Sequence, residues 1–360
     1  MRKIFILIPS FSPSGPVKGA IALANSFAVK NDVTLVALKQ GVGADAALNS
    51  KIRRLCLSNL ASGLAGRVNE YRKMLKCSGG RKAVASISMC FSADMANMLC
   101  RREAIVCSSV RGNLIKNYKM DYGQIGIVLA LTHLICLNCF DHVVVMTSAM
   151  AKQVKRYIFK KPVIIGNFVN EKALDEYRVA KEKKGPIRFI FLGTLSRRKQ
   201  PIVLLKALAI LHQKRNDIRL DVIGSGPLME KAKYICEQFG IQSIVIFHGQ
   251  LKNPYNIISR ADCLVLPSIS EGISRAALES LYLNTPCVLR RVDGNHELIK
   301  NGINGFLFEK EDELPDAMLK AAELSRRNCK KISNLLPNAF RQDVAYKRYF
   351  DLFTQLSGMD

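Results

Sequence analysis

The segment Pro267–Leu281 carries the residues best suited to chemistry in this chain. It holds two glutamates, Glu271 and Glu279, directly after the apolar run Cys263–Leu266. Ser274 is a natural N-cap and the residues after it favour a helix, so backbone N–H groups there would bind an anion. Glu271 precedes the predicted helix and Glu279 lies more than one turn inside it, so at about 1.5 Å per helical residue the two carboxylates are well separated. They would therefore reach different parts of one elongated ligand. One carboxylate would accept hydrogen bonds from sugar hydroxyls and the other from a ribose diol. By itself Glu-x7-Glu is a loose pattern that two unrelated surface glutamates would also produce.

Three further loops carry glycines or cations after predicted strands. Gly193 opens a turn that leads to Arg197, Arg198 and Lys199, a cluster that suits a diphosphate because cations and a helix N-terminus neutralise its oxygens; a solvated basic turn is the alternative. Gly224-Ser-Gly226 would let the backbone approach a ligand, but the pair alone is a weak signal and also forms plain turns. The glycine loop at 290–305 taken alone is turn chemistry.

A parallel sheet would bring these loops to one edge, where ligands bind in open α/β sheets. From Ile187 onward, β-rich runs alternate with helix-length segments, the pattern of βαβ units. The predicted strands are Ile187–Leu192, Arg219–Ile223, Ile244–Phe247, Cys263–Leu266, Pro286–Leu289 and Gly305–Phe308.

The first half begins in the same way. Its predicted elements are strand Lys3–Ile8, helix Gly19–Val29, and strands Asp32–Leu38, Ile105–Ser108 and His142–Met146. The length of 360 residues and the 49% hydrophobic content fit two domains. We predict two Rossmann-like, doubly wound α/β domains at 1–170 and 186–335, joined by the charged segment Ala173–Gly185. An amphipathic stretch in 336–360 could pack back on the first domain.

The net charge is +25, and the excess of cations is larger in the first half. Such a field attracts nucleic acid, anionic lipid or a diphosphate ligand, and charge alone does not choose among them. A basic stretch that would hold an acidic bilayer contains Lys51, Arg53, Arg54, Arg67, Arg72, Lys73, Lys76, Arg81 and Lys82. A solvated face that aids solubility is the alternative.

Other features of the sequence predict a cytoplasmic protein, peripheral on the inner face of the plasma membrane. The eleven cysteines are odd in number and scattered, which is typical of reduced thiols. The N-terminal apolar stretch is too short for a signal peptide. The longest apolar run, Ile125–Phe140, is interrupted by polar residues and is shorter than the ~20 residues of a spanning helix.

The order of these motifs resembles the donor domain of retaining glycosyltransferases of family 4, in the group 1 class with the GT-B fold. The series is Phe191-Leu-Gly193…Lys199, Val222-Ile-Gly-Ser-Gly-Pro-Leu, Phe247-His-Gly249, Leu266-Pro-Ser-x-x-Glu271-Gly…Glu279, and Asn301-Gly-x-Asn-Gly305. The first half resembles the family more weakly, through Val143–Met150 and Ile165–Asn170.

The resemblance implies two Rossmann-like domains that face each other across a cleft, and the activity of a hexosyltransferase. The enzyme would move a sugar from a UDP- or GDP-linked nucleotide-sugar to a hydroxyl of a glycan or polyprenyl-diphosphate-linked glycan, with retention of configuration. The process would be polysaccharide biosynthesis, such as lipopolysaccharide assembly at a bacterial surface.

The resemblance also assigns roles to residues. Glu279 would bind the ribose, Glu271 would face the transferred sugar, and Lys199 would contact the diphosphate. The family arginine after the first glycine is replaced by Thr194, so Arg197 or Arg198 would supply that cation, and Arg111 takes the place of a family histidine. The remaining nucleotide-sugar contacts would come from Gly272, Ile273, Ser274, Arg275, Gly193, Arg198, Gly226, Gly249 and Gly15.

No Asp-x-Asp stands in a loop where a metal would be needed, so we expect neither metal nor cofactor; Lys199, an adjacent arginine and a helix dipole would take the charge of the leaving diphosphate. Two alternatives remain. A nucleotide-sugar 2-epimerase on the same fold would consume the nucleotide-sugar without an acceptor. A nucleic-acid-binding protein is disfavoured because the cations are not interleaved with aromatics and there is no Trp.

Overall fold

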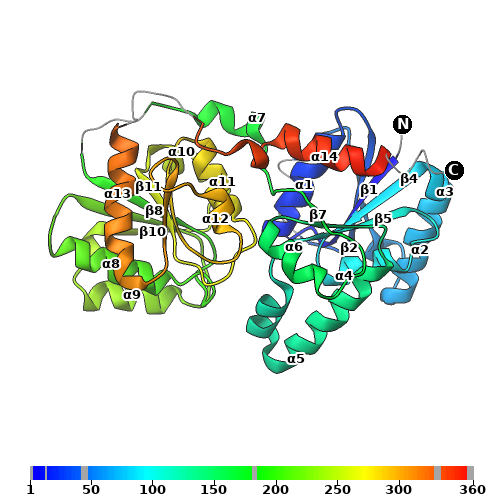
Figure 1. The fold of residues 1–360 in the computed structure, drawn as a ribbon, viewed down its shortest axis with the longest axis horizontal. Coiled ribbons are helices and arrows are strands. Elements are labelled where there is room, and N and C mark those ends of the chain that lie inside the picture. Colours follow the sequence, from blue (N-terminus) through cyan, green and yellow to red (C-terminus); the bar gives the residue numbers. More distant parts are fainter. Residues whose placement is uncertain (1–2, 13, 42–47, 181–184, 328–333, 355–360) are drawn as a thin grey trace. The chain divides into compact units, whose positions relative to one another are not determined.

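In a computed structural model the chain forms two α/β units, described over residues 3–12, 14–41, 48–180, 185–327 and 334–354 (Figure 1). The first unit comprises Met1–Val169 and Asn338–Asp360, and the second comprises Asn170–Pro337. Each unit is built on one parallel sheet with helices on its faces. The predicted fold class, two doubly wound α/β domains, is confirmed.

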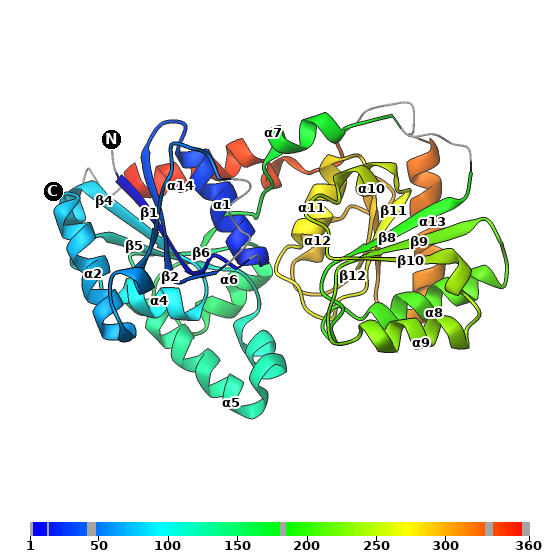
Figure 2. The ribbon, with the colours of Figure 1, turned by 180° about the vertical axis from the view of Figure 1, so that it is seen from behind.

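The sheet of the first unit has seven parallel strands in the order β3-β2-β1-β4-β5-β6-β7 (Figure 2). These strands are β1 Lys3–Ser10, β2 Asp32–Lys39, β3 Arg53–Cys56, β4 Val84–Ser88, β5 Ile105–Val110, β6 His142–Val145 and β7 Val163–Ile164. The α-helices of this unit are α1 Gly15–Phe27, α2 Gly63–Cys77, α3 Gly80–Ala83, α4 Phe91–Met98, α5 Leu114–Cys136, α6 Ser148–Lys155 and α14 Gln342–Thr354.

Strand β1 shows why this sheet is covered on both faces. Its side chains alternate, so Ile4, Ile6 and Ile8 enter a core cluster with α1 and α14, while Phe5 and Leu7 enter a second cluster with α2 and α4. All five side chains are buried. A continuous apolar run is what a strand buried on both faces requires.

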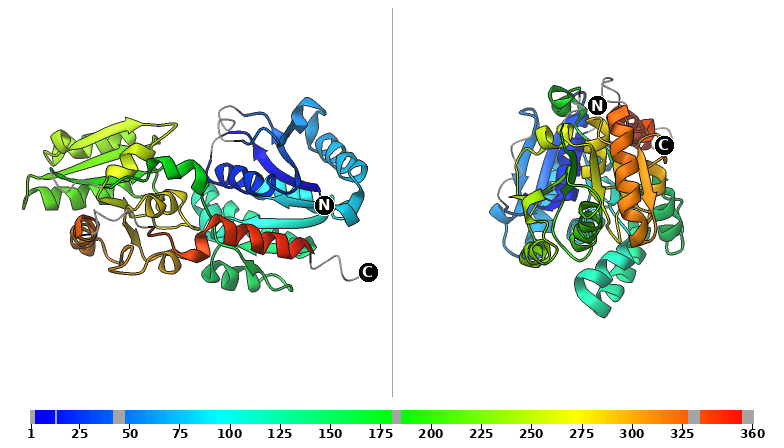
Figure 3. Two further views of the ribbon diagram at one scale, coloured as in Figure 1. Left: turned by 90° about the horizontal axis from the view of Figure 1, so that it is seen from above. Right: turned by 90° about the vertical axis from the view of Figure 1, so that its left-hand side faces the viewer.

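Helix α14 lies along α1 (Figure 3). Tyr349 is fully buried and its hydroxyl is 3.0 Å from the Ser109 hydroxyl on β5. The Phe27 ring of α1 lies 6.3 Å from the ring of Tyr349 and 6.4 Å from that of Phe353. The C-terminal helix is thus part of the core of the first unit, whereas residues 355–360 lie outside the described ones.

The sheet of the second unit has six parallel strands in the order β10-β9-β8-β11-β12-β13. These strands are β8 Ile187–Leu192, β9 Ile218–Ile223, β10 Val245–Gly249, β11 Cys263–Leu266, β12 Cys287–Arg290 and β13 Gly305–Phe308. The α-helices are α7 Glu171–Leu174, α8 Pro201–His212, α9 Met229–Gln238, α10 Tyr255–Arg260, α11 Arg275–Tyr282, α12 Asn295–Leu298 and α13 Leu314–Arg327. The strand order reverses between β8 and β11, so the loops after these two strands flank the switch point where ligands bind in such sheets.

The segment that the sequence suggests as a linker is partly structured. After α7, a 3₁₀ turn at Asp175–Tyr177 packs on α10, and the Tyr282 hydroxyl of α11 donates to Asp175 at 2.5 Å. The first part of the segment therefore belongs to the second unit, and residues 181–184 lie outside the described ones.

Helix α5 differs from the expectation for residues 125–140. Together with a short 3₁₀ turn it runs over Leu114–Cys139, and by length and composition it is apolar enough to cross a membrane, although only 28% of its most apolar window is buried. Gly123 has non-helical angles (φ 63°, ψ −143°), so the helix bends into two arms. The earlier start at Leu114 makes the apolar segment longer than the sequence pattern suggests.

Candidate functional site

The loops after β8 and β11 meet at the switch point of the second sheet. Strands β8 and β11 are direct neighbours, with Cys263 paired to Phe189 and Leu264 to Ile190. The amide of Ile269 donates to the carbonyl of Arg198 at 2.9 Å, which joins the two loops. Lys199 in the basic turn and Glu271 in the glutamate segment are 72 residues apart in the sequence. The sheet brings these two segments together at its switch point.

Glycines let three strand ends approach one another at this edge. The amide of Gly193 donates to Ile223 at 2.9 Å, and that of Gly224 donates to Gly249 at 2.7 Å. A Cβ on Gly224 would lie 2.0 Å from the carbonyl oxygen of Gly193, and one on Gly226 would lie 2.5 Å from that of Leu195. Because no side chain fits, the backbones themselves form this floor of the site.

Lys199 and Glu271 form an ion pair above this floor. The Lys199 ammonium donates to Oε1 of Glu271, and the two side chains are only 13% and 8% exposed. The Lys199 stem packs over Gly193, where a Cβ would lie 3.6 Å from its Cε. The Glu271 amide donates to the Asp293 carboxylate at 2.8 Å, which fixes the backbone of the loop. An ammonium has three N–H donors, so the pair with Glu271 occupies one of them.

Helix α11 begins where the sequence predicts. Ser274 is the N-cap, but its side chain makes no capping hydrogen bond, so the expectation of a side-chain cap is not met. Gly272, Ile273 and Ser274 are buried in the loop that leads into the helix. A ligand at this helix start would therefore meet the backbone N–H groups of these residues rather than the serine hydroxyl.

Glu279 is 6% exposed and lies one turn beyond Arg275, whose guanidinium is 3.5 Å from its Oε1. Burial, followed by the negative charge of Glu279, raises the pKa of the neighbouring Tyr255 phenol. The Tyr255 ring packs on that of Tyr177 with centroids 5.4 Å apart. Glu279 is thus a buried carboxylate paired with Arg275, and its charge is felt by the Tyr255 phenol.

The two arginines proposed to replace the family cation differ in position. Arg197 is exposed, and Arg198 is partly buried with its carbonyl bonded to Ile269. Thr194 is exposed beside them, and Gly249 has a positive φ of 66° at the end of β10. The structure places both arginines in the site loop.

Arg111 and Gly15 belong to the first unit. Arg111 follows β5, and its guanidinium donates to Oδ1 of Asn167 at 3.2 Å and lies 3.1 Å from the Met89 sulfur. A Cβ on Gly19 would lie 3.6 Å from the guanidinium, so α1 packs closely against it. Gly15 is the exposed first residue of α1. Arg111 and α1 are therefore neighbours at the carboxyl edge of the first sheet.

Sequence reasoning missed Asp293, Tyr255 and Asn167 as neighbours of the proposed site residues. Asp293 has a positive φ of 47°, and its position before Gly294 is the one local signal. Tyr255 lies on a different helix, α10, and the effect of the Glu279 charge on its pKa is something that no spacing in the sequence reveals. Among the described residues, no group of three or more His, Cys, Asp or Glu side chains could hold a metal ion.

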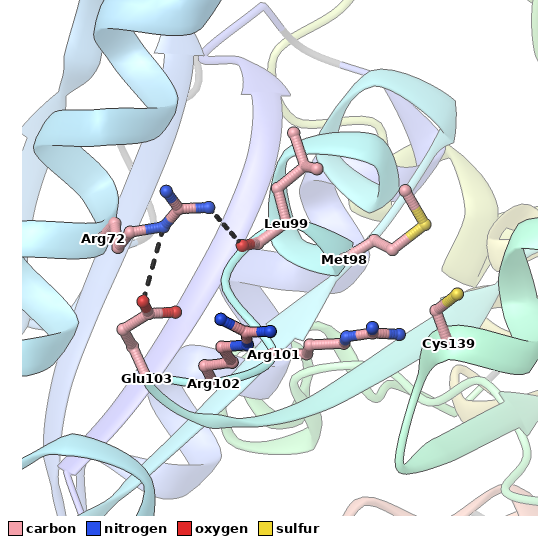
Figure 4. A pocket seen from close by; sticks show the side chains of 7 residues that line it. All are labelled: Arg72, Met98, Leu99, Arg101, Arg102, Glu103 and Cys139. Atoms are coloured by element: carbon pink, nitrogen blue, oxygen red, sulfur yellow. Dashed lines mark hydrogen bonds and ion pairs between the residues drawn. The ribbon is translucent and has the colours of Figure 1, made fainter.

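A separate cavity of about 390 Å³ lies in the first unit (Figure 4). Arg72 spans its wall by donating to the Leu99 carbonyl at 2.6 Å and pairing with Glu103 at 3.4 Å. The other lining residues are Met98, Arg101, Arg102 and Cys139. These residues precede β5 and β6, so the cavity opens at the amino ends of strands, away from the carboxyl edge that holds Arg111.

Comparison with known proteins agrees with the arrangement of the second unit. Residues 173–335 match the family described as Glycosyl transferases group 1. S. aureus TarM has a similar structure, with a TM-score of 0.81 at 12% identity over 98% of this chain and 99% of TarM. Anabaena HepE, in a complex with UDP and glucose, gives 0.76 at 15% identity over 99% and 100%. The fold of the chain is therefore that of the GT-B proteins.

Two bacterial relatives are similar in sequence. An Escherichia coli enzyme named "UDP-Gal:alpha-D-GlcNAc-diphosphoundecaprenol alpha-1,3-galactosyltransferase" is 26% identical over 66% of this chain and 65% of its own length, slightly less than two thirds. A Campylobacter jejuni alpha-1,4-N-acetyl-D-galactosaminyltransferase, whose name includes an undecaprenol-linked acceptor, is 22% identical over 90% and 89%. Residues 173–335, nearly all of the second unit, are thus similar to a glycosyltransferase family, and the first of these relatives is matched over slightly less than two thirds of its length.

Proposed function

We propose that this protein transfers a sugar from a UDP- or GDP-linked nucleotide-sugar to a hydroxyl of a lipid-linked glycan, in the assembly of a bacterial surface polysaccharide. The observation that carries the proposal is the buried Lys199–Glu271 pair at the switch point of the second sheet, with the buried Glu279 further along α11. The group 1 match supports the reaction class, and the names of the two relatives support the class of acceptor.

In this proposal different residues of the second unit bind different parts of the nucleotide-sugar. Lys199, Arg197 and Arg198 hold the diphosphate, because their cations lie in the loop after β8. Glu271 and the backbone of Gly272–Ser274 face the sugar. Glu279 accepts hydrogen bonds from the ribose hydroxyls, since a buried carboxylate with a diol partner forms charge-assisted bonds.

We propose retention of configuration without a metal ion. The Lys199 ammonium and the helix start at Ser274 stabilise the negative charge that develops on the leaving diphosphate. The acceptor hydroxyl attacks from the face on which the diphosphate leaves, and a diphosphate oxygen takes its proton. Family resemblance supports this stereochemistry, and no enzymic nucleophile is assigned.

We place the protein in the cytoplasm, peripheral at an anionic membrane, because a lipid-linked acceptor is confined there. In the basic stretch from Lys51 to Lys82, three cations already pair internally: Arg72 with Glu103, Lys73 with Glu70, and Arg81 with Asp141. This pairing weakens that stretch as a membrane contact, and other parts of the first unit must contribute.

Release of nucleoside diphosphate, measured with and without acceptor, tests the reaction class. A glycosyltransferase releases it in proportion to the elongated acceptor, with slow hydrolysis when acceptor is omitted. Steady consumption of the nucleotide-sugar without acceptor would favour the 2-epimerase alternative instead. A gel shift at physiological salt tests for nucleic-acid binding, which the proposal does not expect.

A further inference from the structure

The bent helix α5 leaves an apolar face uncovered. In its second arm, residues 124–136, the side chains of Ile125, Val128 and Ile135 are 72%, 64% and 63% exposed. Together with the exposed Thr132 they recur at helical spacing, so they form one stripe along the arm. We call Ile125, Val128 and Ile135 the apolar stripe.

The opposite face of the same arm is packed and polar. Ala130, His133 and Leu134 are buried, and His133 Nε2 is 2.8 Å from the Asp94 carboxylate of α4. The first arm closes against the second through Tyr118, whose hydroxyl is 2.9 Å from His133 Nδ1. These bonds fix the arm with the stripe facing outward, because turning it would expose the core face and bury the stripe.

Phe159 continues this apolar surface. It is 90% exposed, and its amide donates to Asn138, which in turn donates to the Ile135 carbonyl at the end of the arm. Lys160 and Lys161 follow it directly. The Lys155 ammonium donates to the Phe159 carbonyl at 3.0 Å, and the Lys160 ammonium donates to the Phe140 carbonyl at 2.6 Å. An aromatic ring framed by cations is typical of a residue that sits at a bilayer interface.

The charges near the apolar stripe indicate what kind of partner surface it would contact. No Asp, Glu, Lys or Arg occurs from Tyr122 to Phe140. The first arm carries Lys116, Lys119 and Asp121, Asp141 follows Phe140, and the chain as a whole carries +25. An apolar stripe on a chain with this net positive charge complements an anionic bilayer. A second copy of this chain would bring cations against cations, which opposes self-association through the same face.

We propose that the α5 hairpin inserts the apolar stripe and Phe159 into the interface of an anionic phospholipid bilayer. The segment lies in the membrane surface rather than crossing it. The second arm is about 20 Å long at ~1.5 Å per residue, against the ~30 Å of a hydrocarbon core, and its inner face carries the His133–Asp94 pair. The inference rests on the proposed function in one respect, because a lipid-linked acceptor explains why the protein would meet a membrane. Insertion itself requires neither nucleotide-sugar nor acceptor.

Partition of the full chain between buffer and vesicles tests the proposal. The vesicles contain phosphatidylcholine with or without phosphatidylglycerol. The variant Ile125→Ser, Val128→Ser, Ile135→Ser is expected to bind anionic vesicles at least a hundredfold more weakly, since each CH₂ withdrawn from the bilayer costs roughly fourfold. Tyr234→Ser, Ile246→Ser, Ile303→Ser is the matched control, because these side chains of the second unit are also exposed (58%, 46% and 64%). The control is expected to bind as wild type.

The absence of tryptophan from the chain provides an independent measurement. Val128→Trp places the chain's only tryptophan on the stripe. We expect the tryptophan emission to shift to the blue with anionic vesicles and to be quenched by brominated acyl chains. Tyr234→Trp is expected to show neither effect. Lys155→Gln, Lys160→Gln, Lys161→Gln should reduce binding about tenfold or more for anionic vesicles only.

Two results would overturn the inference. One is wild-type vesicle binding by the stripe variant together with an unshifted Val128→Trp spectrum. The other is a stripe variant that loses self-association in light scattering with unchanged vesicle binding, which would make the face a protein interface. Nucleotide binding by the stripe variant in solution, measured by calorimetry, separates a failure of this inference from a failure of the proposed function.

Discussion

Lys199 and Glu271 are ion-paired across the switch point of the second sheet, with both side chains largely buried. One comes from the loop after β8 and the other from the loop after β11, so the pair exists only when these two strands are neighbours. It links the fold of the unit to the proposed chemistry, because the lysine that joins the two loops lies at the edge of the sheet where ligands bind in such folds.

Removing one partner of this pair separates stability from catalysis. Lys199→Met leaves the Glu271 carboxylate buried without its cation, and we expect a loss of about 3 kcal/mol in the free energy of unfolding. The double variant Lys199→Met, Glu271→Gln removes the uncompensated charge and should recover most of that loss. Denaturant unfolding measures both.

Catalysis should not recover with stability. In both variants we expect the transfer rate to fall by a factor on the order of 10² to 10³, because they lack the cation that we propose to stabilise the leaving diphosphate. A stable double variant with wild-type turnover would show that Lys199 holds the loops together and does nothing more.

Gly224 should tolerate no side chain. An alanine Cβ would lie 2.0 Å from the Gly193 carbonyl at a φ of +133°, so the floor of the site must move. Gly240 is a matched control, since its φ of +64° is also unfavourable for alanine but nothing lies within 4 Å. Gly240→Ala is expected to cost about 1 kcal/mol of unfolding free energy, and Gly224→Ala clearly more. Equal losses in thermal unfolding would contradict the close packing of the two loops.

The first unit should lose stability in mild acid through His142. Burial, only partly offset by Asp141, lowers the pKa of His142, which lies under α14 with its ring 6.3 Å from that of Phe353. The folded state therefore takes up the proton less readily than the unfolded chain. Its contribution is present above about pH 6.5, the ordinary histidine value, and is lost as the pH falls through the lowered pKa.

Denaturant unfolding of wild type and His142→Gln at a series of pH values checks this. The variant is expected to lose less stability between pH 7 and pH 5 than wild type does. Identical slopes would show that His142 contributes nothing to the acid sensitivity of the unit.

Chelation should leave the reaction intact. We propose that cationic side chains and a helix start, not a metal ion, take the charge of the diphosphate, so transfer rates with and without an excess of EDTA should agree. A rate that collapses with EDTA and returns with Mg²⁺ or Mn²⁺ would refute metal independence.

Much of the second unit could be predicted from the sequence because its strands are apolar runs between glycine turns. Three strands have the same bounds in the prediction and in the structure: Ile187–Leu192, Cys263–Leu266 and Gly305–Phe308. The glutamate segment was found for the same reason, since it directly follows a buried strand. Its pairing with Lys199 depends on strand order, which local patterns do not encode.

The first unit was harder to predict. Strand β4 contains Ser86 and Ser88, which are buried against Asn97 and Asp94 of α4 in a hydrogen-bond network, so it lacks an apolar pattern. Strand β3 begins with two arginines and lies at the edge of its sheet. The bend of α5 depends on Gly123, one glycine in an otherwise helical pattern, and without it the outward stripe could not be recognised.

Binding of a panel of UDP- and GDP-linked sugars, followed by thermal shift in the presence of EDTA, tests directly whether the second unit holds a nucleotide-sugar at Glu279. We expect at least one nucleotide-sugar to raise the melting temperature. We also expect Glu279→Gln to weaken the affinity for that ligand by about tenfold or more, the value of a hydrogen bond to a charged group. Glu230→Gln, at a side chain 85% exposed on α9, should bind as wild type. No response to any nucleotide-sugar, or equal affinity in the Glu279→Gln variant, would refute the proposed nucleotide-sugar site.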